Sequence, residues 1–211
     1  MVDKFCDYLT KKIREKSPEI SDEKAEEINY GLHIMFGEVP KVFIMAAIAG
    51  ILGIFKWTII CFCLMLPYRT YSGGFHLKTH IGCIIGTSIM YTGNAFISQQ
   101  FELPYITKII CASGLLIFSI IMVYLYAPAD TEDVPVVSKK ERKKRRNISF
   151  VIVTIMLISS VFVKNNSISN IILIGVLLQT ISITRLAYKL TNNKYGYEEY
   201  WKNKNQVIKA S

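Results

Sequence analysis

Cys83 and two histidines lie close together in the sequence, between two apolar runs. Cys83 follows His80 by three residues and His76 by seven. A thiolate is a strong nucleophile, and a neighbouring imidazole can take the thiol proton and later give it to a leaving amine. These residue types therefore indicate cysteine-nucleophile chemistry at the edge of an apolar segment.

The spacing alone does not decide which histidine pairs with the thiol. On a helix, His80 and Cys83 share one face about one turn apart. His76 would be two turns away, about 10 Å along the axis, which is too far for a hydrogen bond. It reaches Cys83 only if its own segment leaves the helix and folds back, and Gly73-Gly74 supplies the backbone freedom for such a turn. The two histidines rank equally at this point.

Two other interpretations of these residues stay open. The spacing i, i+4, i+7 of His76, His80 and Cys83 would place all three on one helix face as zinc ligands, with water completing the site of a hydrolase. Alternatively, both histidines are interfacial polar residues and Cys83 is a core residue. The dense polar run 69–80 disfavours that structural interpretation, because polar side chains beside a bilayer core are costly without a role.

Arg69 and Asp130 are candidate supporting residues. Arg69 follows an apolar run, where it either anchors the segment at the membrane rim or binds a carboxylate. Asp130 belongs to a loop that holds three carboxylates. One of the three could accept a hydrogen bond from Arg69 or orient the imidazole. A solvated acidic turn is the more ordinary expectation for that loop.

The composition indicates a membrane protein. Hydrophobic residues make up 51% of the 211, and they are gathered in blocks long enough to approach a bilayer span. The cysteine count of 5 is odd, so no disulfide framework is expected. The polar start of the chain argues against a cleavable signal peptide.

The expected fold is all-α and polytopic, with about six hydrophobic transmembrane or re-entrant helices in a single domain, 1–211. The N-terminal region, 1–37, reads as two amphipathic helices, 2–16 and 21–36, that lie on the membrane or bind a peptide. The other expected parts are a helical hairpin at 42–67, a catalytic loop at 68–80, transmembrane helices at 81–98, 105–126, 148–163 and 168–185, and a cytoplasmic loop at 127–147.

The charge distribution predicts the orientation. The net charge is +9, and every residue of 139–146 is Lys or Arg except Glu141. Between two spans, such a run is typical of a cytoplasmic segment near anionic lipid rather than of a nucleic-acid site. Two spans back, the segment around Arg69 is then cytoplasmic as well, and an even number of crossings within 42–67 puts both termini inside.

The pattern Arg69-x-Tyr-x-Gly-Gly-x-His76-x-Lys-Thr-x3-Cys83, with a later Ala-Pro-Ala loop before the basic run, resembles the accessory gene regulator B family. The resemblance implies a membrane cysteine endopeptidase that processes a quorum-sensing propeptide with an amphipathic helix and an acidic C-terminal part. It implies Cys83 as nucleophile and His76, rather than His80, as its partner. Arg69 and Gly74 match further functional positions of the family motif, and Gly73, Lys78, His80 and Asp130 are expected to support the site.

The expected partners are this propeptide and membrane lipids, with no cofactor and no metal. Pairing of two copies is compatible with the sequence, although no feature demands it. A transporter is the non-enzymatic rival, and it would need charged residues deep in the bilayer. Lys56 is the one candidate, and a hairpin would place it at a turn.

Overall fold

The computed structural model describes residues 2–17, 19–33, 35–36, 39–77, 79–132 and 135–210. Every regular element in this part of the chain is a helix, which confirms the expected all-α class. The helices are α1 (Val2–Lys16), α2 (Asp22–His33), α3 (Val39–Ile51), α4 (Phe55–Ser72), α5 (His80–Ile97), α6 (Tyr105–Tyr126), α7 (Lys139–Phe162), α8 (Asn166–Ser182), α9 (Arg185–Leu190) and α10 (Gly196–Ala210). Lys78 and the side chain of His80 lie outside the described residues.

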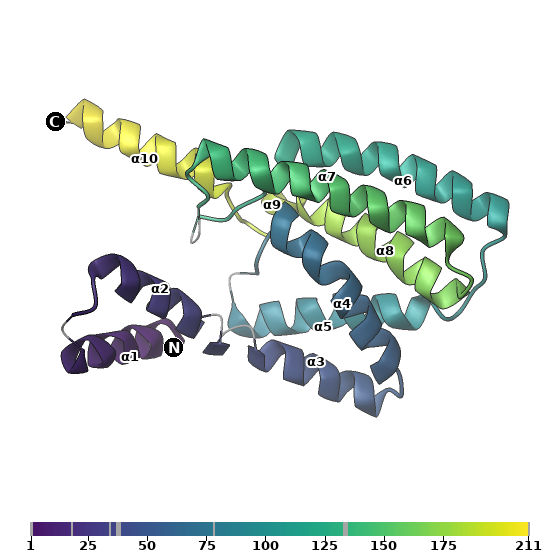
Figure 1. Cartoon of the computed structure of the whole chain (residues 1–211), viewed down its shortest axis with the longest axis horizontal. Helices are drawn as coiled ribbons and strands as arrows, with labels where there is room; N and C mark the ends of the chain where they lie inside the picture. The colour runs from purple at the N-terminus through teal and green to yellow at the C-terminus, as the bar shows by residue number, and fades with distance from the viewer. Residues whose placement is uncertain are drawn as a thin grey trace.

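The N-terminal pair α1 and α2 lies to one side of the other helices (Figure 1). The two helices pack on each other, and the Asn29 side chain donates a hydrogen bond of 2.9 Å to the Asp7 carboxylate. Cys6 is buried, whereas Phe5 and Tyr8 are exposed. Exposed aromatic residues on a charged helix fit the amphipathic character expected of this region.

Helices α3 and α4 occupy the stretch where a helical hairpin was expected. They pack against each other and are joined by a turn whose Gly53 has φ +70°, a conformation that favours glycine. Lys56 lies in the first turn of α4 and its ammonium lies over the Trp57 ring. The charge is therefore next to a turn rather than in mid-helix.

Two helices, α6 and α7, are long and apolar enough to cross a bilayer, and only a minor part of the apolar window of each is buried inside the protein. Helices α3, α5 and α8 are apolar but shorter. Exposed isoleucines follow each other along α6 at helical spacing, namely Ile106, Ile110, Ile117 and Ile121. A stripe of large exposed apolar side chains on a helix of this length suits contact with lipid.

The core is built around α8, which contacts α4, α5, α6 and α7. In Figure 1, α6, α7 and α8 run side by side and α4 crosses between them and the α3–α5 pair. Gly175 lets α4 approach α8, because a Cβ there would overlap the Met65 sulfur. The buried Tyr68 hydroxyl is 3.0 Å from Thr180 Oγ1, so a polar contact fixes the same two helices.

Three boundaries differ from the sequence analysis. Helix α4 continues through Pro67 to Ser72, so the expected loop 68–80 is reduced to the residues after α4. The basic run is helical rather than part of a loop, because Ser138 caps α7 and Glu141 lies in its first turn, as in a capping box. The last expected span, 168–185, ends at Ser182, and Thr184 starts the short helix α9.

Candidate functional site

The two glycines after α4 make a turn that no other residue type would fit. Gly73 and Gly74 have φ of +74° and +138°. A Cβ on Gly73 would overlap the carbonyl oxygen of Ala129, in the loop before α7. Ala129 N donates to Ser72 O and Gly74 N donates to Ala129 O, both at 2.8 Å. The turn is therefore hydrogen-bonded to a segment that is far away in the sequence.

Arg69, on the last turn of α4, folds over this turn. Its Nη2 donates to Phe75 O at 2.6 Å and its Nη1 donates to Ser182 Oγ at 3.1 Å. A Cβ on Gly74 would overlap Nη1 and stand 2.6 Å from Ser182 Oγ, so Gly74 makes room for the guanidinium. The hydrogen-bond partners of Arg69 among the described residues are neutral oxygens, whereas a carboxylate partner had been considered from the sequence. The arginine braces the loop from the α4 side.

Gln179 of α8 also holds the glycine turn, and this role was not predicted from the sequence. The side chain is buried, and its Nε2 donates to Ser72 Oγ at 2.9 Å and to Gly73 O at 2.7 Å. An amide in the middle of an apolar run was the available signal, because such a group is costly unless it has partners.

His76 and Cys83 lie on different kinds of backbone. His76 is exposed and lies in the non-helical segment after the glycine turn, whereas Cys83 is half-buried in the first turn of α5. Thr79 caps this helix, since its side chain accepts from Gly82 N at 3.1 Å and its carbonyl accepts from Cys83 N at 2.9 Å. The break in the helix that a His76–Cys83 pair requires is therefore present.

The zinc hypothesis loses its geometric basis. It needed His76, His80 and Cys83 on one continuous helix, and α5 begins only at His80. The side chain of His80 lies outside the described residues, and among the side chains that are described no group of three or more His, Cys, Asp or Glu is arranged to hold a metal ion.

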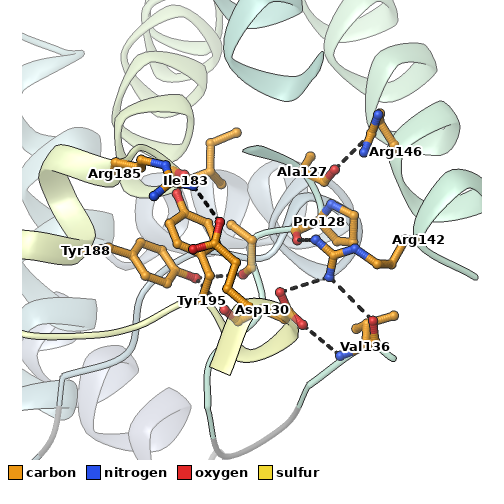
Figure 2. Close-up of polar contacts among 12 residues, drawn as sticks. Ala127, Pro128, Asp130, Val136, Arg142, Arg146, Ile183, Arg185, Tyr188 and Tyr195 are labelled. Carbon is orange, nitrogen blue, oxygen red and sulfur yellow. Dashed lines mark hydrogen bonds and ion pairs between the residues drawn. The ribbon is translucent and has the colours of Figure 1, made fainter. Parts of the chain in front are cut away.

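Asp130 pairs with Arg142 rather than with Arg69, and it is not solvated as was expected of its loop. Its side chain is 2% exposed and its carboxylate pairs with Arg142 Nη1 at 3.0 Å. The second oxygen accepts from Val136 N at 2.8 Å, and Arg142 also donates to Pro128 O at 3.1 Å (Figure 2). The helical basic run explains the difference, because it brings Arg142 back over the loop that precedes it.

The basic run therefore has two faces. Arg142 and Arg146 bond to the loop before α7, the latter through Ala127 O at 3.0 Å. Four lysines are instead exposed, namely Lys139, Lys140, Lys143 and Lys144. The arginines hold the loop, and the lysines present positive charge to the surroundings.

Comparison with known proteins identifies the chain. The family model described as accessory gene regulator B matches residues 3–183. The chain belongs to the accessory gene regulator B family. It is similar to an AgrB-like protein of Listeria innocua, at 30% identity over 199 residues and 94% of both chains. It is also similar to an AgrB-like protein of Clostridium acetobutylicum, at 25% identity over 82% of both chains, and to FsrB of Enterococcus faecalis, at 25% identity over 85% of this chain and 72% of FsrB. No solved structure matches the chain.

The AgrB match includes the glycine turn, Cys83 and the Asp130 loop, but it ends before α9. The segment beyond it nevertheless packs on the same loops. Tyr188 donates its hydroxyl to Ala129 O at 2.8 Å, and its ring stacks on Tyr195 with centroids 4.2 Å apart (Figure 2). Burial raises the pKa of both phenols above the ordinary tyrosine value, so both stay neutral and act as hydrogen-bond donors.

Proposed function

We propose that this AgrB family member is a membrane cysteine endopeptidase that cuts a quorum-sensing propeptide, with Cys83 as nucleophile and His76 as its acid–base partner. Membership of the family supports the peptide substrate. The observation that carries the site is the glycine turn, which ends α4, turns the chain out of the helix and leaves His76 on a segment separate from that of Cys83.

The proposed reaction has two acyl transfers. The His76 imidazole takes the Cys83 proton, and the thiolate attacks the scissile carbonyl carbon. The tetrahedral intermediate collapses as the imidazolium gives its proton to the leaving amine, which leaves the substrate bound as a thioester. The His76 imidazole, again neutral, takes the proton of a thiol or hydroxyl within the bound peptide, which attacks the thioester carbonyl, expels the Cys83 thiolate and closes a thiolactone or lactone ring. Exclusion of water at a membrane rim favours this closure over hydrolysis.

The start of α5 supplies the electrostatic support in this proposal. The positive end of a helix dipole favours the negative charge that develops on the attacking sulfur and on the carbonyl oxygen. The N–H groups of Gly82 and Cys83 already donate to Thr79. The proposed oxyanion donors are therefore the backbone N–H groups of the two residues that open the helix, His80 and Ile81.

The expected orientation fits the same proposal. With about six hydrophobic segments in the cell membrane and both termini in the cytoplasm, the glycine turn and the start of α7 lie on the cytoplasmic side. The exposed lysines of α7 would then attract the acidic part of the propeptide, while its amphipathic part lies in the membrane surface. Arg69 contributes to this mechanism by holding the loop rather than by binding the acidic tail.

Substitution of the proposed nucleophile is the direct test. Cys83→Ala is expected to abolish cleavage of the propeptide by the protein in membranes, with normal amounts of inserted protein. Cys111→Ala is the matched control, because Cys111 is an exposed cysteine on α6 and should be dispensable. Cleavage by Cys83→Ala at the normal rate would exclude the thiol mechanism.

The histidine assignment has its own comparison. His76→Ala is expected to lower the cleavage rate by a factor of about 10² to 10⁴, the usual contribution of a general acid–base group. His80→Ala should have a much smaller effect. The opposite order would reassign the acid–base role to His80.

A further inference from the structure

The backbone from Gly74 to His76 is held at each residue by a different part of the molecule. The contacts at Gly74 and Phe75 come from α4, α8 and the loop before α7. The carbonyl of His76 accepts a hydrogen bond of 2.7 Å from the side chain of Asn193. Asn193 lies after α9, in the part of the chain that the family match does not reach.

The turn that presents Asn193 is closely defined. Asn192 has φ +55°, a left-handed conformation that asparagine tolerates better than most residues, and Asn193 N donates to Tyr188 O at 2.8 Å. The same Nδ2 lies 2.8 Å from Thr191 Oγ1 and 3.2 Å from Thr191 O. Because two backbone carbonyls face this nitrogen, the group at this position must be a donor. An aspartate of the same shape would present an acceptor to both.

The geometry points to Asn193 as a positioning residue for His76, an inference that depends on the proposed function. The hydrogen bond from Asn193 to the His76 carbonyl fixes the peptide plane next to the imidazole. Asn193 acts through His76 and touches neither Cys83 nor the substrate in this assignment. The C-terminal segment thus takes part in setting the distance between imidazole and thiol.

The kinetic test compares two neighbouring asparagines in the full-length protein. Asn193→Asp keeps the side-chain shape, removes the donor and places a charge next to the His76 carbonyl. Asn192→Asp adds the same charge one residue away, at a backbone conformation that aspartate also adopts. A displacement on the order of 1 Å in a catalytic group costs up to a hundredfold. We expect kcat for propeptide cleavage to fall tenfold or more in Asn193→Asp with KM within twofold, and both constants to stay within twofold in Asn192→Asp.

Asn193→Ala provides a second variant, which removes the donor without adding charge, and it should also lower kcat. A loss of kcat that is equal in Asn192→Asp and Asn193→Asp would overturn the assignment. So would a change confined to KM, because Asn193 would then act on substrate binding.

A second readout separates positioning from general structural support. Cys83 is retained as the single cysteine, and its alkylation by iodoacetamide is followed as a function of pH. His76→Ala should shift this profile, Asn193→Asp should shift it in the same direction, and Asn192→Asp should leave it unchanged. Added to His76→Ala, Asn193→Asp should produce no further shift, and an equal further shift would refute a role exercised through His76.

The two proposals can fail separately in these experiments. Cleavage that survives Cys83→Ala refutes the peptidase mechanism. An Asn193→Asp protein with the wild-type alkylation profile refutes the positioning role. An alkylation profile that is unchanged in His76→Ala refutes the pairing of His76 with Cys83, on which the positioning role depends.

Discussion

Replacement of Gly73 by alanine should be among the most damaging single-methyl changes in this protein, for two separable reasons. The first is backbone strain, since φ +74° with ψ −149° is a conformation that essentially only glycine adopts, and an L-residue there costs about 1–3 kcal/mol. The second is steric, since the new Cβ would overlap the Ala129 carbonyl oxygen and stand 2.8 Å from its carbon. Ala129 is backbone and cannot rotate away as a side chain would.

The steric cost can be estimated from what must give way. Movement of Ala129 strains its hydrogen bonds to Ser72 O and Gly74 N and the bond from Tyr188 Oη, each of them 2.8 Å long. Each is worth about 1 kcal/mol net. The contact therefore adds about 1–3 kcal/mol, and the expected total for Gly73→Ala is about 2–6 kcal/mol.

The chain contains the controls that separate the two causes. Gly53 has φ +70°, but a Cβ there meets no atom within 4 Å, so Gly53→Ala should cost only the strain. Gly114 is helical and equally open, so Gly114→Ala should cost nothing. The free energy of unfolding of each variant, measured in the same detergent, should rank Gly73→Ala below Gly53→Ala and Gly53→Ala below Gly114→Ala. Equal losses for Gly73→Ala and Gly53→Ala would refute the packing of the turn on Ala129.

Two further predictions concern the basic run. Asp130→Asn should destabilise the protein by about 3–5 kcal/mol, because the Asp130 carboxylate is buried and its loss leaves the mostly buried Arg142 without a counter-ion. Glu141→Gln alters an exposed pair of the same 3.0 Å length and should cost far less, so similar losses would contradict the burial of the Asp130 pair. A cysteine placed at Lys143 in an otherwise cysteine-free protein should react with an impermeant thiol reagent only from the cytoplasmic side, and labelling from outside would invert the orientation proposed for the chain.

Local sequence patterns predicted much of the helical architecture. The helical period over 2–16 and the apolar run 105–126 correspond to α1 and α6, because amphipathic spacing and continuous hydrophobicity are properties of the segment itself. The start of α7 was expected to be a loop, although Ser138 and Glu141 have the spacing of a capping box.

Around the candidate site as well, some features could be anticipated from the sequence and others could not. The glycine pair allowed a break before Cys83 without requiring one, and α4 does end there. The partners of Arg69 and Asp130 were not predicted, because opposite charge on neighbouring loops suggested a pairing that the folded chain does not make. A charge can be read from sequence, but its nearest counter-ion depends on which helices become neighbours.

The sequence by itself determined the all-α class, through helical and apolar patterns within each segment, and the Gly73-Gly74 pair made possible the turn that separates His76 from Cys83. Only the tertiary structure decided that Gln179 and Asn193, more than a hundred residues away along the chain, bond to that turn and to His76. Such contacts arise when α8 and the segment after α9 pack beside the end of α4, and no local pattern encodes that arrangement.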